Sequence, residues 1–96
     1  MTEKRTITRW TLEDSLKTEE DMAHYLDAVI EDGDPELLLD AIGVIAKKRG
    51  MTEVARKAGL GRESLYKALS AKGDPQLSTL LKVLSALGLR LRFEAA

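Results

Sequence analysis

Glycine and proline divide the chain into short segments, and this punctuation limits what it can fold into. Gly33, Gly50 and Gly88 each follow an apolar stripe with helical spacing, and glycine is common just past the end of a helix. Asp-Pro pairs at 34–35 and 74–75 resemble helix starts, with an N-cap followed by a proline in the first turn. The pattern predicts an all-α chain of five helices, at about 19–32, 35–49, 53–58, 62–69 and 76–87, with Thr18 and Thr52 as the N-caps of the first and third.

Both ends of the chain follow a different pattern. Residues 1–17 carry β-type residues around Trp10 without helical periodicity, so we expect a short extended N-terminal arm, in which a strand near 6–11 can form. Residues 89–94, Leu-Arg-Leu-Arg-Phe-Glu, alternate apolar and charged side chains, which is typical of a strand. We therefore expect an arm at 1–17 and a single helical domain at 18–96 that ends in a C-terminal strand.

Composition excludes several classes of protein. The 96 residues can bury one core, and they include no cysteine, which removes disulfides, Cys-based zinc sites and thiol nucleophiles. The sequence has neither an apolar run of transmembrane length nor a signal-peptide pattern, which favours a cytoplasmic protein. His24 is the only histidine. The acidic stretch 31–36 does not begin a calcium loop, because the sixth loop position would be Leu37 instead of glycine and the twelfth Gly43 instead of glutamate. No nucleophile-base pair or phosphate-binding glycine loop is apparent, so we expect no metal, no cofactor and no enzyme activity.

Charge is distributed very unevenly along the chain. Residues 1–46 contain four Lys or Arg and twelve Asp or Glu, a net charge of −8. Residues 47–72 contain eight basic and two acidic residues, a net charge of +6. A basic segment of this kind attracts a polyanion even when the net charge of the whole chain is only −1.

The basic segment contains TEVARKAGLGRESLYKAL, residues 52–69, in which two short helices flank a glycine-containing turn. This is the layout of a helix-turn-helix motif. Ala55 is small where the two helices pack most closely, and Gly59 lies where the turn favours a positive φ. Apolar residues would anchor the unit to the core: Val54, Ala58, Leu60, Leu65 and Leu69. The second helix of such a motif fits the DNA major groove.

At this point the sequence resembles a known group. Residues 50–88, with EVARKAG, GLGRESLYKAL and TLLKVLSALGL, resemble the Xre or lambda-repressor-like DNA-binding domain. The longer stretch 20–93 is similar to the antidote proteins of bacterial addiction modules, which are antitoxins paired with RelE/ParE-like toxins. The resemblance implies a five-helix DNA-binding antitoxin that represses its own operon and neutralises a small toxin. Two features depart from the family: Gly61 replaces a serine N-cap found in many relatives, and the arm at 1–17 fits poorly.

Candidate DNA contacts follow from the expected exposed face of the fourth helix and from the cations around it. The candidates for base contacts are Arg62, Glu63, Tyr66 and Lys67. The candidates for phosphate contacts are Lys47, Lys48, Arg49, Arg56, Lys57, Ser64 and Lys72. Each has a structural alternative: solvated charges for the cations, a helix-dipole acid for Glu63, cations at a helix C-terminus for 47–49, and packing on Arg62 for Tyr66.

A homodimer is expected, because two recognition helices related by a two-fold axis read a palindrome with half-sites about 34 Å apart. The fifth helix and the following strand offer more apolar residues than a small core needs. The candidate interface residues are Leu80, Val83, Leu84, Leu87, Leu89, Leu91 and Phe93. The alternative is that the first two helices cover this stripe.

Other functions stay open at this stage. The chain can be a helix-turn-helix regulator without a toxin partner, or a protein-interaction domain that does not bind DNA. The net charge of +6 in 47–72 favours DNA binding over the latter. Trp10 either folds back on the domain or contacts a partner protein, and residues 89–93 either pair with the arm or add as a strand to a partner.

Overall fold

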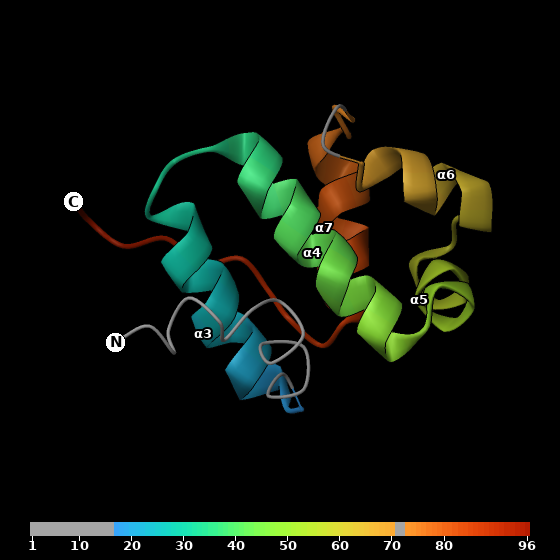
Figure 1. The fold of residues 1–96 in the computed structure, drawn as a ribbon, viewed down its shortest axis with the longest axis horizontal. Helices are drawn as coiled ribbons and strands as arrows, with labels where there is room; N and C mark the ends of the chain where they lie inside the picture. Colours follow the sequence, from blue (N-terminus) through green and yellow to red (C-terminus); the bar gives the residue numbers. More distant parts are fainter. Residues whose placement is uncertain (1–16, 71–72) are drawn as a thin grey trace, which may run out of the picture.

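A computed structural model describes residues 17–70 and 73–96 of the chain. This part is all-helical, with five α-helices and no strand (Figure 1). The helices are α3 (Glu19–Ile30), α4 (Pro35–Arg49), α5 (Met51–Ala58), α6 (Arg62–Ala68) and α7 (Leu77–Ala86). They lie close to the segments that the sequence predicts. Most of the N-terminal arm, including Trp10, and Lys72 lie outside the described residues.

The first two helices begin where their capping residues place them. The Thr18 hydroxyl accepts a hydrogen bond from the Asp21 backbone N–H at 3.0 Å, and the Asp21 carboxylate accepts one from the Thr18 N–H at 3.2 Å. This reciprocal pair is a capping box. At α4 the Asp34 carboxylate accepts from the Glu36 N–H at 2.9 Å, and Pro35 occupies the first turn. Both predicted caps are confirmed.

Two other predicted capping signals are wrong. Gly50, with φ +102°, is the N-cap of α5, so Thr52 lies inside the helix and makes no side-chain cap. Glycine allows α4 to end and α5 to begin at a single residue. Helix α7 begins at Leu77, one residue after the predicted start, with Gln76 and not the Asp74-Pro75 pair at its N-cap. Just before it the chain lies close to the end of α6: a Cβ at Gly73 would lie 2.5 Å from the Lys67 carbonyl oxygen.

The core lies between α4 and the helices around it. Ile42 and Ile45 of α4 are fully buried, as are Met22 of α3, Leu65 of α6 and Val83 of α7. Helix α3 packs mainly on α4, whereas α5 packs mainly on α7 and also touches α4 and α6. Figure 1 shows α3 at one side of α4, with α5 and α6 at the other. Within 17–70 and 73–96, no helix is both long and apolar enough to cross a membrane.

The C-terminal segment differs from the prediction. Helix α7 ends at Ala86, and the chain turns away at Gly88, which has φ +81°. The Leu89 N–H then donates to the Leu84 carbonyl at 2.9 Å. Residues 89–96 then form neither helix nor strand and run back toward α3 (Figure 1). The expected strand does not form in this single copy, because no other described segment pairs with it.

Candidate nucleic-acid interface

The turn between α5 and α6 fixes how α6 is presented. Gly59 is left-handed, with φ +73° and ψ +30°. The Leu60 N–H donates to the Ala55 carbonyl at 2.9 Å, and the Gly59 N–H donates to the Arg56 carbonyl at 3.2 Å. These two bonds form a Schellman motif, which stops α5 and redirects the chain. Ala55 is buried, as the sequence predicts for a close packing position.

Helix α6 turns its apolar side to the core and its polar side to solvent. Leu65 is 0% exposed, and Leu69 just beyond the helix is buried as well. The remaining candidate side chains of the helix are all exposed: Arg62, Glu63, Ser64, Tyr66 and Lys67. The N-cap is Gly61, which offers no side-chain hydrogen bond, in agreement with the sequence.

Arg62 and Tyr66 lie one turn apart and contact each other. The Arg62 guanidinium carbon lies 5.6 Å from the centroid of the Tyr66 ring. This distance is typical of a cation–π contact. The ring therefore limits the positions that the guanidinium can take while leaving its donors accessible to solvent.

The other candidate cations surround α5. Lys47, Lys48 and Arg49 are exposed in the last turn of α4, and Arg56 and Lys57 are exposed on α5. Two of the five lie in ion pairs. Arg49 pairs with Glu19 at the start of α3, at 3.2 Å, and Arg56 pairs with Glu53 one turn earlier on its own helix. The spacing of Glu53 and Arg56 could have predicted the second pair, but Glu19 and Arg49 lie 30 residues apart.

The ion pairs shift the titration of their carboxylates. The pKa of Glu19 is lowered by a hydrogen bond from its own backbone N–H and then by the Arg49 guanidinium. The pKa of Glu53 is lowered mainly by the hydrogen bond from Arg56, and the pKa of Arg56 is raised in turn.

Arg49 and Lys57 also line one small polar recess with Glu19, so the structure brings together cations from α4 and α5.

The candidate dimer residues divide into two groups. Val83, Leu84 and Leu87 are buried in the core of the single chain, against α5 and its neighbours, so they are not available to a second copy. Leu80 and Leu89 are half-buried. Leu91 is 42% and Phe93 90% exposed. The surface that a second copy can reach is therefore in the C-terminal segment and not on the buried face of α7.

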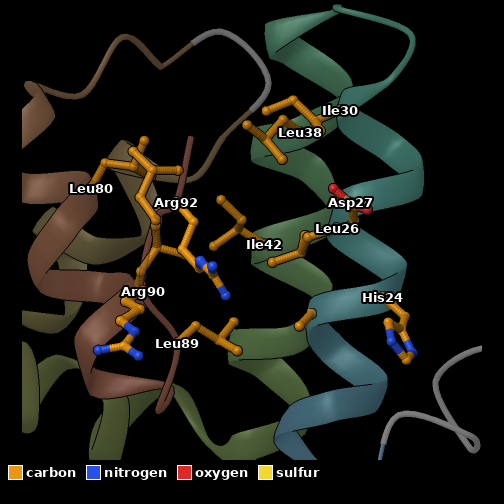
Figure 2. A pocket seen from close by; sticks show the side chains of 13 residues that line it. His24, Leu26, Asp27, Ile30, Leu38, Ile42, Leu80, Leu89, Arg90 and Arg92 are labelled. Atoms are coloured by element: carbon orange, nitrogen blue, oxygen red, sulfur yellow. The ribbon is translucent and has the colours of Figure 1, made fainter. Parts of the chain in front are cut away.

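A groove that the sequence did not predict lies between α3, α4, α7 and the C-terminal segment. Its volume is about 330 Å³. Figure 2 shows Leu26, Ile30 and Leu38 on one side, Leu80 and Leu89 on the other, and the Arg92 side chain reaching in between. The groove combines residues from four separate segments, so no local pattern could have revealed it.

Among the described residues, no group of three or more His, Cys, Asp or Glu side chains could hold a metal ion.

Comparison with known proteins identifies the family. Residues 6–95 match the family described as "Probable addiction module antidote protein". A protein of Haemophilus influenzae, described only as uncharacterized, is 43% identical over 79 residues, which cover 82% of this chain and 81% of that protein. No solved structure matches the chain. The family match begins at residue 6, so the expectation that the arm at 1–17 departs from the family is wrong for most of its length. The chain belongs to the family of probable addiction module antidote proteins.

Proposed function

We propose that this chain is an antitoxin that binds operator DNA as a homodimer, represses its own operon and neutralises a small RelE/ParE-like toxin. One observation carries the DNA-binding part: α6 is anchored by the fully buried Leu65 while its charged and aromatic side chains are exposed. Family membership supports the antitoxin part. The protein acts by binding and not by catalysis, in the cytoplasm.

In this proposal, α5, the turn at Gly59 and α6 form a helix-turn-helix motif of the lambda-repressor type. Helix α6 enters the major groove, and its base contacts come from Arg62, Glu63, Tyr66 and Lys67. Arg62 suits a guanine, whose O6 and N7 accept a bidentate guanidinium. Its contact with the Tyr66 ring reduces the side-chain entropy lost on binding. Glu63 suits the N4 amino group of a cytosine.

The surrounding cations position the helix on the DNA backbone. The proposed phosphate contacts come from Lys47, Lys48, Arg49, Arg56, Lys57, Ser64 and Lys72. Glu19 and Glu53 compete with phosphate for Arg49 and Arg56, since each already holds one of them. Lys57 takes part in no ion pair within the described residues, so it binds phosphate without first losing a carboxylate partner.

The two kinds of contact are separable by mutation. Fluorescence anisotropy with the DNA upstream of this gene, and with single-base variants of it, compares Arg62→Ala, Lys57→Ala and wild type. Arg62→Ala is expected to cost about 1–3 kcal/mol at one base pair and to relax the preference there. Lys57→Ala is expected to weaken binding to all duplexes about equally.

Lys82→Ala, an exposed lysine on α7, is the matched control and leaves both quantities unchanged. If Arg62→Ala and Lys57→Ala weaken all duplexes alike, α6 is not the recognition helix.

The antitoxin part has its own test. A small reading frame beside this gene is expressed alone and together with this chain in a bacterial host. We expect growth arrest in the first case, growth in the second, and co-purification of the two proteins. A neighbouring product that arrests growth equally with and without this chain would contradict the antitoxin assignment, and the DNA-binding test would be unaffected.

A further inference from the structure

Phe93 has no place in the single chain. Its side chain is 90% exposed, more than any other large apolar residue of the described part. An aromatic ring that stays in water does not contribute the free energy that burying its large apolar surface provides. Aromatic residues normally bury that surface in a core or an interface. Leu91, two residues earlier, is 42% exposed and borders the groove.

The groove next to this segment is mainly apolar and open. Its apolar walls include Leu26, Ile30, Leu38, Leu80 and Leu91, and its polar lining residues are His24, Asp27, Arg90 and Arg92. Its volume of about 330 Å³ exceeds the ~150 Å³ of an apolar cavity that takes up benzene, so a phenylalanine ring fits. Phe93 follows the groove-lining residues of its own chain but does not line the groove itself, which leaves the groove open to the ring of another copy.

The charges of the segment are self-complementary. When two copies of residues 89–95 run antiparallel with Arg92 opposite Arg92, Arg90 of each lies opposite Glu94 of the other, and Leu91 lies opposite Phe93. One face of the resulting ribbon is apolar and the other is charged. The single like-charged pair, at Arg92, lies between two attractive pairs. In the single copy the Arg92 side chain lines the groove, so it turns out to the charged face when the strands pair. Within the described chain, residues 90–94 donate or accept no backbone hydrogen bond, so their N–H and C=O groups are available for a ladder.

We propose that a second copy of this chain occupies the groove. The 89–95 segments of the two copies pair as antiparallel strands centred on Arg92, and Phe93 of each copy enters the groove of the other beside Leu91. The contact is reciprocal, as a two-fold interface requires. It explains both the strand-like alternation of 89–94 and the absence of a strand in the single copy. The proposal rests on the proposed function only for its role, which is to join two DNA-reading helices.

Cysteine cross-linking tests the register, because the chain has no cysteine of its own. Directly opposed residues of antiparallel strands have Cα atoms about 4.5–5.5 Å apart, within the ~4.4–6.8 Å range of disulfides. Under mild oxidation at micromolar concentration, Arg92→Cys is expected to form a covalent dimer of about twice the 10.6 kDa chain mass. Glu94→Cys is the matched control: its two copies lie four residues apart along the ribbon, about 13 Å, and are not expected to cross-link.

Charge reversal tests the same pairing without a covalent bond. In sedimentation equilibrium, Arg90→Glu and Glu94→Arg are each expected to raise the dimer dissociation constant at least tenfold, and the double variant to restore it. Phe93→Ala is expected to act like the single variants, while circular dichroism stays unchanged because the ring supports no part of the monomer.

Three results would overturn the proposal: a wild-type chain that is monomeric at micromolar concentration, a Phe93→Ala variant that dimerises like wild type, or cross-linking of Glu94→Cys as fast as of Arg92→Cys. All these measurements are made without DNA. A dimer that binds no DNA contradicts the proposed function alone. A monomer that binds DNA contradicts this inference and the homodimer of the proposed function, but leaves its DNA-reading helix standing.

Discussion

The two ends of this molecule differ in what they expose. At the α5–α6 end the aliphatic residues are mostly buried, with Leu65 at 0% exposure, and the surface is charged apart from the Tyr66 ring, which is 43% exposed. At the α3 end, apolar side chains reach the surface beside an open groove, among them Ile30, which is 45% exposed. A surface that is rich in cations and exposes one aromatic ring suits DNA, whereas several aliphatic residues beside a groove suit another protein chain.

Charge follows the same division. Residues 17–46, which include α3 and most of α4, contain one basic and nine acidic residues, a net of −8. Residues 47–70 contain seven basic and two acidic residues, a net of +5. The Glu19–Arg49 ion pair joins the two regions at their border. The near-zero charge of the whole chain thus conceals two surfaces of opposite sign, each suited to a different partner.

Of the substitutions that probe the two ends, removal of the Leu65 side chain, which anchors α6, should change the free energy of unfolding most. Leu65→Ala leaves a cavity under the helix and is expected to lower the free energy of unfolding by about 2–5 kcal/mol. Leu77→Ala, at a leucine of α7 that is 62% exposed, is expected to change it by about 0.5 kcal/mol or less. Urea denaturation followed by circular dichroism measures both. Equal losses for the two variants would mean that α6 is not held by Leu65.

The turn before α6 should be the next most sensitive position. Gly59→Ala places a Cβ on a residue with φ +73° and is expected to cost about 1–2 kcal/mol, although no neighbouring atom lies within 4 Å. Gly61→Ser is the matched control on the other side of the turn. Gly61 has an ordinary φ of −71°, and serine is a favourable N-cap, so this change is expected to be neutral or slightly stabilising. A Gly59→Ala variant as stable as wild type would contradict the left-handed turn.

The capping box at the start of α3 gives a smaller effect at the opposite end. Thr18→Ala removes the acceptor for the Asp21 N–H and is expected to cost about 1 kcal/mol, while Thr18→Ser keeps the cap. Thermal unfolding of the two variants measures the difference. If serine and alanine destabilise the protein equally, the hydroxyl does not cap the helix.

The smallest effect concerns the ion pair at the border of the two regions. This pair joins Glu19 and Arg49. In the folded protein the pKa of the Glu19 carboxyl is below its ordinary value of 4.5, so folding favours the charged form of Glu19. The resulting stabilisation is present above about pH 4.5 and is lost as the pH falls through the lowered pKa. In an NMR titration, Arg49→Ala is expected to move the pKa of Glu19 upward, and Lys48→Ala to leave it nearly unchanged. An unchanged Glu19 pKa in Arg49→Ala would exclude the ion pair in solution.

Local signals in the sequence predicted the features that depend on neighbouring residues. The caps at Thr18 and Asp34 and the left-handed turn at Gly59 were predictable, because each is decided within about four residues. The N-caps of α5 and α7 were not. Gly50 replaces the expected cap at Thr52, because α4 ends and α5 begins at this one glycine. Gln76 replaces the expected Asp74-Pro75 cap of α7, although the helix starts within one residue of the predicted position.

Features that need distant segments were beyond the sequence. The apolar stripe of α7 predicted a dimer interface, because the sequence does not indicate which residues cover it. In the structure the chain's own helices bury Val83, Leu84 and Leu87. The groove depends on α3 and on the C-terminal segment lying side by side. Because this face of α7 is buried, the proposed dimer contact lies in residues 89–95.

The central claim is that the basic α5–α6 end binds the phosphate backbone of DNA. The salt dependence of DNA binding tests this claim most directly. With the duplex upstream of this gene, anisotropy titrations between 50 and 200 mM salt are expected to give a slope of log K against log salt concentration of about −4 to −6, as for four to seven phosphates neutralised per dimer. An affinity that stays flat over this range, or no binding at low salt, would contradict the account.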